Sequence, residues 1–261
     1  MTILDEIVAH KRREVMEAKE QRPLEMLQEV IAGAPTPRDF PGALMGERIR
    51  LIAEIKAASP SGGILRENID PIALATAYVR GGAAAISVVT EKRYFRGRPE
   101  YIPQVKRAGP APVLLKDFLL DTYQIYEARV LGADAVLLIA AILAPNELAE
   151  LVAIARGLGM APLVEVHTEE EVINAVQAGA RLIGVNCRDL RTFAVDPQVA
   201  ARLRPLIPPG VLSVAESGIK TRQDVEWLEA LGYHAVLVGT TLVTSVDPEA
   251  KVRELTGARD L

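Results

Sequence analysis

Short apolar runs alternate with amphipathic segments along most of the chain. Each run is five to seven residues long and apolar on both faces, which is typical of a strand buried in a parallel sheet. The runs predict eight strands, at Leu51–Ile55, Ala84–Thr90, Pro112–Phe118, Ala135–Ala141, Pro162–His167, Leu182–Cys187, Val211–Ser217 and Ala235–Thr240. The segments between and after them predict helices near Pro71–Arg80, Pro99–Arg107, Thr122–Leu131, Pro145–Leu158, Glu169–Gln177, Pro197–Leu203, Arg222–Leu231 and Pro248–Leu255.

Many of the predicted helices begin or end at residues that favour capping. Glycine just past a helix end adopts the left-handed conformation at little cost. Five helix-to-strand junctions carry such a glycine, at residues 81–83, Gly132, Gly159, Gly179 and Gly232. A carboxylate just before a helix accepts hydrogen bonds from its first N–H groups, and this role is predicted for Asp70, Asp121, Asp196 and Asp247. The repeating unit is therefore helix, glycine cap, buried strand and loop.

Eight such units predict an α/β protein with a closed (β/α)8 barrel, or TIM barrel, formed as one domain over residues 1–261. The main alternative is an open doubly wound sheet, which more often has fewer strands and a glycine-rich first turn. The first turn here, residues 57–63, reads AlaAlaSerProSerGlyGly. Residues 1–48 precede the first strand and carry helical patterns near Ile3–Glu20 and Leu24–Ile31. We expect this N-terminal helical extension to pack onto one end of the barrel.

Composition argues against several kinds of partner and site. The chain has 261 residues, 49% of them hydrophobic, and its net charge of −4 gives no reason to expect nucleic acid or an anionic membrane as a partner. The single cysteine excludes an internal disulfide and a multi-cysteine metal site. Charges interrupt the apolar stretches of the N-terminus, which indicates an amphipathic helix rather than a signal peptide. No apolar run nears the roughly 20 residues that span a bilayer, so we expect a cytoplasmic protein.

Four of the predicted strands carry charges where core residues are expected. The first has Glu54 and Lys56, the third Lys116, the fifth Glu165 and the seventh Glu216. A buried charge costs several kcal/mol unless it is paired or used in function. A lone one is more often a structural ion pair. Five near the C-terminal strand ends, where such barrels place catalytic groups, indicate one assembled site.

Small residues at the ends of two strands suggest an anion site. The loop after the seventh strand reads GluSerGlyIle (216–219), and the eighth strand ends ValGlyThrThr (238–241). Barrels often bind phosphate in the loops after strands seven and eight, where backbone N–H groups can approach it. Each signal alone is weak. Together they favour a phosphate site that includes Gly218, Gly239 and Thr240, with Ser59 adding a hydroxyl group.

Several other residues have two interpretations. His167 could act as a base, but a histidine between a strand end and a helix more often caps the helix or faces solvent. Only 4% of the chain is aromatic, so Phe95 and Phe118 at strand-end loops suggest an apolar part of a ligand, with core packing as an equal alternative. Cys187 is interpreted as a packing residue.

The motifs resemble those of the indole-3-glycerol phosphate synthase family. The matching segments are AlaGluIleLysAlaAlaSerProSer (53–61), ProValLeuLeuLysAspPhe (112–118), LeuValGluValHis (163–167), GlyValAsnCysArgAspLeuArgThrPhe (184–193) and AlaGluSerGlyIle (215–219). The resemblance runs from about residue 3 to residue 256. It implies the conversion of 1-(2-carboxyphenylamino)-1-deoxyribulose 5-phosphate to indole-3-glycerol phosphate, with loss of carbon dioxide and water, in tryptophan biosynthesis. It also implies that no metal or organic cofactor is used.

The resemblance implies catalytic roles for individual residues. Lys116 resembles the general acid that protonates the ribulose carbonyl, and Glu165 resembles the base or acid that assists dehydration. Lys56 resembles the lysine that holds the substrate carboxylate, and it could itself donate a proton. Glu54 and Asn186 resemble residues that orient the substrate and the catalytic groups. Such proton transfers favour lysine and glutamate pKa values drawn toward neutrality.

The remaining implied roles concern substrate binding. Polar residues that resemble substrate ligands or their supports are Arg188, Glu216 and Ser217. Residues expected to line the pocket for the anthranilate ring are Pro60, Phe95, Phe118 and Leu190. Residues expected to face the phosphate are Ser59, Gly218, Gly239 and Thr240. The implied partner is a small phosphorylated substrate, and a monomer is expected, although the sequence leaves an oligomer open.

Some positions depart from the family pattern, and rival functions stay open. Ala57 and Gly62 stand where basic residues are usual, Cys187 where a second asparagine is usual, and Thr240 in a strand end that usually reads GlyGluSer or similar. These departures concern phosphate affinity and the entrance loop. The rivals are a Schiff-base aldolase, in which a strand lysine attacks a carbonyl, a barrel of the phosphoribosylanthranilate isomerase type, and a phosphosugar-binding subunit without activity.

Overall fold

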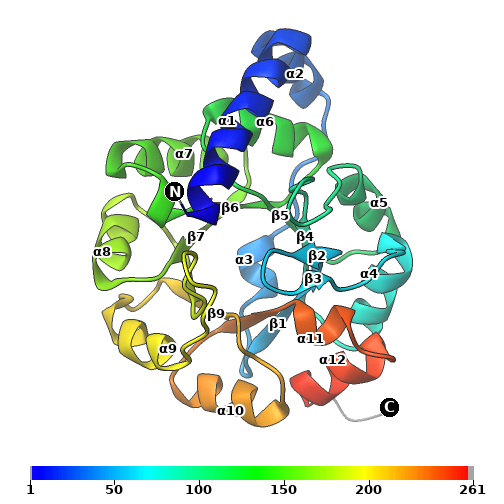
Figure 1. Cartoon of the computed structure of the whole chain (residues 1–261), viewed down its shortest axis with the longest axis vertical. Coiled ribbons are helices and arrows are strands. Elements are labelled where there is room, and N and C mark those ends of the chain that lie inside the picture. The colour runs from blue at the N-terminus through cyan, green and yellow to red at the C-terminus, as the bar shows by residue number, and fades with distance from the viewer. Residues whose placement is uncertain (1, 258–261) are drawn as a thin grey trace.

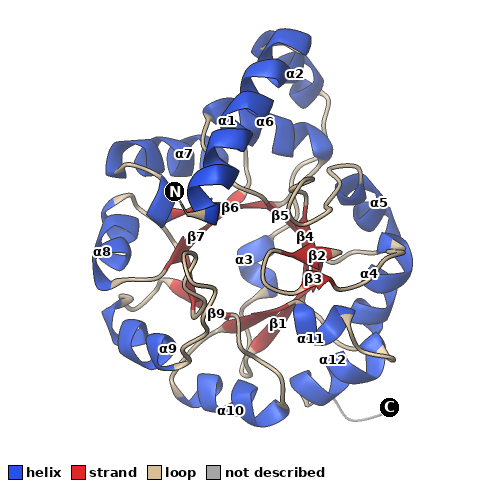
Figure 2. Ribbon diagram, viewed as in Figure 1, coloured by secondary structure: helices blue, strands red, loops and turns tan. Residues whose placement is uncertain are grey.

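The computed structural model describes residues 2–257 and contains a closed barrel of eight parallel strands. The strands surround a central axis, with helices on the outside (Figure 1, Figure 2). Around the barrel their order is β1-β10-β9-β8-β7-β6-β5-β4. They are β1 (Arg50–Ile55), β4 (Ala85–Val89), β5 (Val113–Lys116), β6 (Ala135–Ile139), β7 (Ala161–Val166), β8 (Leu182–Asn186), β9 (Leu212–Glu216) and β10 (Ala235–Val238). The predicted closed barrel is confirmed, and the alternative of an open sheet is wrong.

The outer helices follow the predicted segments closely. They are α4 (Pro71–Arg80), α5 (Tyr101–Ala108), α6 (Thr122–Leu131), α7 (Pro145–Gly157), α8 (Glu169–Gln177), α9 (Gln198–Leu203), α10 (Arg222–Ala230) and α12 (Pro248–Thr256), with single 3-10 turns at Ala140–Ile142 and Arg204–Leu206. Each junction predicted to hold a capping glycine has one with a positive φ, at Gly82, Gly132, Gly159, Gly179 and Gly232. The side chains of Asp70, Asp121 and Asp247 cap their helices as predicted. Asp196 also caps its helix, because its Oδ1 accepts a hydrogen bond from Gln198 N at 3.0 Å, although Pro197 occupies the N-cap position of α9.

Strand alternation divides the core into two apolar layers. Side chains such as Leu51, Ala53 and Ile55 of β1 join the cluster between the strands and the outer helices. Ile52 on the same strand joins a second cluster in the barrel interior. Since side chains alternate along a strand, Glu54 points to the same interior side as Ile52. The interior is therefore apolar below and charged near the C-terminal ends of the strands.

The N-terminal extension contacts both ends of the barrel, so the prediction of a single contact end is wrong. Helix α2 (Leu24–Ala32) packs on α6, and α1 (Ile3–Gln21) lies beside α6 toward the C-terminal ends of the strands (Figure 1). Helix α3 (Phe40–Ala43) closes the other end, inside the ring of strands in Figure 2. Phe40 and Leu44 are buried in the interior cluster, which Ile7 of α1 also joins. The apolar interior has two open ends, and the extension supplies side chains for both.

Two small elements near the C-terminal strand ends were not predicted. A hairpin of β2 (Ala58–Ser59) and β3 (Gly63–Ile64) forms in the loop after β1. Helix α11 (Thr240–Val243) follows β10 directly. Among residues 2–257, no helix has both the length and the apolar character needed to cross a membrane.

Candidate active site

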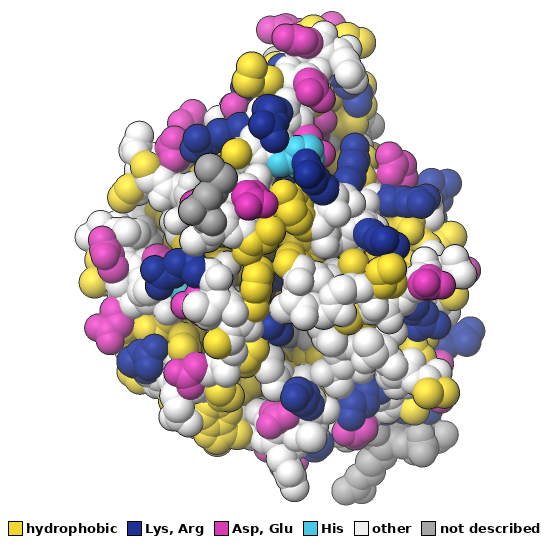
Figure 3. Space-filling model, in the orientation of Figure 1, with side chains coloured by type: hydrophobic (Ala, Val, Ile, Leu, Met, Phe, Trp, Pro, Cys, Tyr) yellow, Lys and Arg dark blue, Asp and Glu magenta, His cyan; other side chains and the backbone are white. Residues whose placement is uncertain are grey.

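A cavity of about 500 Å³ opens at the C-terminal ends of the strands. Its size is typical of a small-molecule site. Figure 3 shows a depression near the middle of this face, with hydrophobic side chains along its margin. All the candidate residues from the sequence except His167 line the cavity: Glu54, Lys56, Ser59, Pro60, Phe95, Lys116, Phe118, Glu165, Asn186, Arg188, Leu190, Glu216, Ser217, Gly218, Gly239 and Thr240. The fold thus brings these residues together, while their individual roles stay predictions.

Lys116 at the end of β5 is the centre of the charged cluster. Its Nζ lies 2.6 Å from Glu216 Oε2, 3.3 Å from Glu165 Oε2 and 4.0 Å from Glu54 Oε2. Lys56 follows β1, and its Nζ lies 2.7 Å from Glu54 Oε1. The three carboxylates are almost completely buried. Two lysines and three glutamates from four strands therefore form one connected network.

The surroundings shift the pKa values of this network unequally. Burial lowers the pKa of Lys116, but the attraction of Glu216, Glu165 and Glu54 outweighs burial and raises that pKa above its ordinary value. Burial raises the pKa of Glu54, but Lys56 and Lys116 outweigh burial and lower it. Both shifts favour the charged forms. The prediction that the pKa of Lys116 is drawn toward neutral pH is wrong, because three carboxylates face its ammonium group and raise that pKa.

Glu165 and Glu216 both pair with Lys116, but their pKa values are shifted in opposite directions. Burial raises the pKa of Glu165, but Lys116, His167 and Asn186 outweigh burial and hold it well below its usual value. For Glu216, burial and repulsion from Glu165 and Glu54 outweigh Lys116 and raise the pKa to about 7. Of the three glutamates in this network, Glu216 is therefore the one whose pKa lies near neutral pH.

Two glycines make room for these carboxylates. A side chain at Gly184 of β8 would collide with the Glu216 carboxylate, and one at Gly239 would collide with the Glu54 carboxylate. Neither glycine has a positive φ. Their small size is thus required by the charged side chains beside them, a reason for Gly239 that is separate from its predicted contact with phosphate.

Asn186 and Arg188 shape the loop after β8. Asn186 Oδ1 accepts a hydrogen bond from Arg188 N at 3.0 Å, and Arg188 Nη1 donates to Phe193 O at 2.9 Å. Phe193 has a φ of 60° and lines the cavity. Non-glycine residues rarely adopt this conformation outside turns and functional loops. Phe193 was not assigned a role from the sequence, because nothing there revealed that its loop folds back over the site.

Aromatic side chains form one wall of the cavity. The rings of Phe95 and Phe118 lie 6.2 Å apart between centroids. The carboxylate of Glu91, itself buried, accepts hydrogen bonds from the backbone N–H groups of residues 93–95 and holds this turn. Ala58 N donates to Phe95 O at 3.1 Å, which joins the β2–β3 hairpin to the wall. The two phenylalanines therefore stand on braced loops and present apolar surface to a ligand.

The candidate phosphate residues lie on two linked loops. Ser217 and Gly218 have φ values of 69° and 82°, so the chain turns sharply after β9. Thr241 Oγ1 donates to Ile219 O at 2.7 Å and joins this turn to the start of α11. Ser59, on the opposite hairpin, accepts a hydrogen bond from Gly62 N, so its hydroxyl supports its own turn. The two loops after β9 and β10 are held together as one surface.

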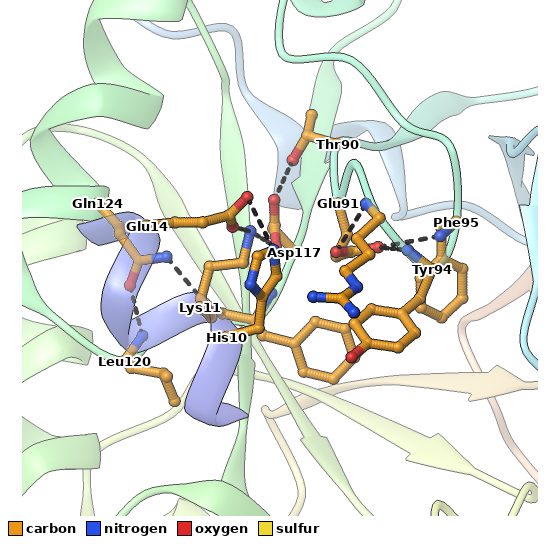
Figure 4. Close-up of polar contacts among 12 residues, drawn as sticks. His10, Lys11, Glu14, Thr90, Glu91, Tyr94, Phe95, Asp117, Leu120 and Gln124 are labelled. Atoms are coloured by element: carbon orange, nitrogen blue, oxygen red, sulfur yellow. Dashed lines mark hydrogen bonds and ion pairs between the residues drawn. The ribbon is translucent and has the colours of Figure 1, made fainter. Parts of the chain in front are cut away.

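An ion pair joins the N-terminal extension to the end of β5. Lys11 Nζ lies 2.9 Å from Asp117 Oδ1 and 2.7 Å from Glu14 Oε2, and Thr90 Oγ1 donates to the other Asp117 oxygen (Figure 4). Lys11 is buried, and its pKa is raised because Asp117 and Glu14 outweigh the effect of burial. Asp117 lies between Lys116 and Phe118 in the chain, so this contact fixes the backbone that carries two site residues.

The sequence pattern of α1 carries a signal for the burial of Lys11. The buried residues of α1 are Ile7, Lys11 and Val15, which are spaced four apart on one helical face. A lysine in the middle of such an apolar face predicts a buried partner. The partner itself could not be found from spacing, because Asp117 is about a hundred residues away in the chain.

His167 does not face solvent, so that part of its interpretation is wrong. Its imidazole lies between two carboxylates, with Nε2 3.4 Å from Glu165 Oε1 and Nδ1 3.1 Å from Glu171 Oε2. The N-cap of α8 is Thr168, not His167. The histidine is therefore part of the charged network around Glu165.

Barrel and cavity together define a class of protein: a (β/α)8-barrel enzyme with acid–base groups at the C-terminal ends of its strands. Solved barrels show the same fold at low identity. One is a 3-hexulose-6-phosphate synthase, with a TM-score of 0.66 and 16% identity over 80% of this chain and 99% of that one. Another is KGPDC from Streptococcus mutans, with a TM-score of 0.62 and 13% identity over 81% of this chain and 97% of that one.

Sequence comparison gives the family. The model for indole-3-glycerol phosphate synthase matches residues 4–255. Relatives named indole-3-glycerol phosphate synthase include one from Dehalococcoides mccartyi strain CBDB1, 49% identical over 97% of this chain and 99% of that protein. Another, from Carboxydothermus hydrogenoformans, is 49% identical over 94% and 96%. The chain belongs to the indole-3-glycerol phosphate synthase family.

Proposed function

We propose that the chain is a cytoplasmic carboxy-lyase of tryptophan biosynthesis that acts as a monomer. Its substrate is 1-(2-carboxyphenylamino)-1-deoxyribulose 5-phosphate, and its products are indole-3-glycerol phosphate, carbon dioxide and water. The observation that carries the proposal is the Lys116 ammonium among three buried carboxylates, in the cavity of a chain of this family.

Proton transfer is the chemistry that this network supplies. Ring closure joins a carbon of the aromatic ring to the ketone carbon, and the carbonyl oxygen takes a proton from Lys116. The carboxylates keep Lys116 charged until that oxygen becomes strongly basic. Carbon dioxide then leaves, and its bonding electrons restore the aromatic ring. Glu165, held ionised, accepts the proton that is lost from the carbon next to the hydroxyl-bearing carbon, and passes it to the hydroxyl group, which departs as water and leaves the new ring double bond.

Substrate binding uses the two ends of the cavity. Lys56 pairs with the substrate carboxylate, and Glu54 orients the lysine at 2.7 Å. Phe95, Phe118, Pro60 and Leu190 hold the anthranilate ring against the ketone, which supplies proximity. The phosphate lies on the loops after β9 and β10, near Ser217, Gly218, Gly239 and Thr240, with Ser59 on the opposite side. Arg188 and Asn186 support this arrangement from the loop after β8.

The test is turnover of the purified protein, followed by the fluorescence of the indole product. Wild type is expected to be active, and Lys116→Ala is expected to lose about 10²–10⁴-fold in kcat, the usual contribution of a positioned acid. Lys19→Ala removes a more exposed lysine that pairs with Asp121 outside the cavity, and should leave kcat unchanged. An inactive wild type, or a fully active Lys116→Ala, would contradict the proposal.

The aldolase alternative is separated by trapping. A Schiff base needs a neutral lysine nucleophile, whereas the carboxylates around Lys116 favour its ammonium form. Borohydride added during turnover is therefore expected to leave the protein mass unchanged. A substrate-sized adduct on Lys56 or Lys116 would favour the aldolase mechanism instead.

A further inference from the structure

His167 and Glu171 form a second layer behind Glu165. Neither lines the cavity, whereas Glu165 does. His167 follows β7 directly, two residues after Glu165, so both side chains leave the backbone on the same side. Glu171 lies in the first turn of α8, and its Oε2 accepts a hydrogen bond from His167 N at 2.7 Å as well as contacting Nδ1 at 3.1 Å. Glu171 therefore holds both the backbone and the ring of His167.

The two oxygens of Glu165 have different partners. Oε1 lies 3.4 Å from His167 Nε2, and Oε2 lies 3.3 Å from Lys116 Nζ. One oxygen thus faces the second layer, and the other faces the acid of the proposed reaction. Positive groups on both sides of the carboxylate favour one orientation of Glu165, which is what a base in a crowded site requires.

Burial strengthens the electrostatic interaction between His167 and Glu165. The side chains of Glu165, His167 and Glu171 are 2%, 13% and 17% exposed. Nε2 of His167 is shielded from solvent and makes no hydrogen bond within the described residues, so Glu165 at 3.4 Å is the polar atom it faces. Burial lowers the pKa of His167, but its contacts with Glu165 and Glu171 outweigh burial and raise the pKa to about 10. The ring is therefore an imidazolium at neutral pH.

We propose that His167 and Glu171 are positioning residues for Glu165: the imidazolium, fixed by Glu171, anchors Oε1 of Glu165 and leaves Oε2 toward Lys116 and the substrate. This inference rests on the proposed function, since it assigns the source of orientation for the proposed base. The arrangement is a carboxylate–imidazolium–carboxylate chain that runs from the cavity into the first turn of α8. Its middle member supplies a positive charge from outside the cavity.

All charged groups around this chain enter its pH dependence. His167 faces Glu165 on β7 and Glu171 on α8. Glu165 faces Lys116 on β5, His167 and the amide of Asn186 on β8, and Lys116 links it to Glu216. Loss of the His167 charge removes one of two cations beside Glu165. The pKa of Glu165 must then rise, because a nearby cation favours the ionised form of a carboxylate.

The test is the pH profile of kcat for His167→Asn, which removes the charge and keeps a polar side chain. If Glu165 must be ionised, the acid limb of the profile should move up by about 1 pH unit. We expect kcat at pH 7.5 to fall by about tenfold, a part of what a positioned base contributes. KM should stay within about twofold, since His167 does not touch the cavity. A profile and kcat equal to those of an active wild type would overturn the inference.

Further variants separate charge from fold. His167→Lys keeps a cation and should retain the wild-type acid limb, even where kcat falls. Glu171→Gln should lower the pKa of His167, so that activity is lost at a lower pH on the alkaline side. Glu170→Gln is the matched control, since it removes the neighbouring exposed charge in the same turn of α8. A Glu170→Gln profile that shifts like that of Glu171→Gln would also overturn the inference.

One measurement needs no variant and no turnover. In protein labelled with ¹⁵N-histidine, one of the three imidazoles is expected to stay doubly protonated at pH 8. If all three lose a proton below pH 7, the buried imidazolium does not exist and the inference fails. An inactive wild type with a charged imidazole would instead contradict the proposed reaction and leave the anchored carboxylate in place.

Discussion

At the scale of single residues, the site concentrates charge where a barrel core would be apolar. Glu54, Glu165 and Glu216 meet around Lys116, and only two lysines balance three carboxylates. The surplus acid takes the form of Glu216, whose pKa rises to about 7 because of burial and repulsion. Such an arrangement suits the proton transfer proposed above, and it makes the stability of the folded chain sensitive to pH.

Replacement of Glu216 should reveal this sensitivity. An unfolded glutamate releases its proton near pH 4.5, so between about pH 5 and 7 the folded chain binds the extra proton. The contribution of Glu216 to the free energy of unfolding therefore falls as pH rises through this window. Glu216→Gln mimics the protonated form and should gain stability relative to wild type between pH 5 and 8. Urea unfolding at both pH values measures the difference, and an equal pH dependence in the two proteins would contradict it.

At the scale of elements, α1 supports the catalytic end of the barrel through one buried ion pair. Lys11 pairs with Asp117, next to Lys116, while His10 of the same helix packs against Tyr94 with 6.4 Å between ring centroids. Tyr94 belongs to the turn held by Glu91, which also carries Phe95. Helix α1 therefore contacts both the loop after β4 and the loop after β5 (Figure 4).

Lys11→Met should weaken both stability and activity. It leaves Asp117, whose side chain is only 11% exposed, without its cation; for a buried pair such a change typically costs about 3–5 kcal/mol, and the substitution also releases the backbone beside Lys116. Lys19→Met is the matched control, because Lys19 pairs with Asp121 from the same helix but is 45% exposed, and exposed pairs contribute at most about 1 kcal/mol. Thermal unfolding and kcat are measured for both. Equal effects of the two substitutions would show that the buried pair has no special role.

The elements themselves were largely predictable from local pattern. Apolar runs located the eight strands to within one or two residues, and glycines such as Gly132 and Gly232 marked helix ends because the left-handed conformation favours them. Helix α3, the β2–β3 hairpin and the contact of Lys11 with Asp117 were not predicted. Short elements carry too few residues for a periodic signal, and contacts across a hundred residues leave no trace in spacing. The predicted direction of the Lys116 pKa shift was wrong for the same reason, since that direction depends on three partners from other strands.

At the scale of the whole molecule, the extension and the barrel share one interior. Phe40 and Leu44 of the extension are buried with strand residues such as Ile52, Leu114 and Leu237. Nearby, Arg38 N donates to Asp134 at 2.6 Å, just before β6. We therefore expect residues 1–261 to behave as a single cooperative domain, with no separate unfolding of the extension.

Phe40→Ala tests this cooperativity. Removal of a fully buried phenylalanine typically costs about 3–5 kcal/mol. The single tryptophan, Trp227, lies on α10 of the barrel and reports barrel unfolding by fluorescence. If the chain unfolds as one domain, the substitution should lower the urea midpoint measured by Trp227 fluorescence and the one measured by far-UV circular dichroism by the same amount. An unchanged fluorescence midpoint would mean that the extension unfolds by itself.

The closure of the barrel by β1 and β10 has a consequence for synthesis on the ribosome. Strand β1 pairs with β4 and with β10, whose residues emerge almost two hundred residues after those of β1. At about 5–20 residues per second this delay is roughly 10–40 s. Asp117 is synthesised after Lys11 with about half that delay, and the apolar face of α1 is exposed during this interval. Strand β1 is therefore the first strand to be made and among the last to complete its pairing, and we expect early chaperone binding to be concentrated on residues 3–55.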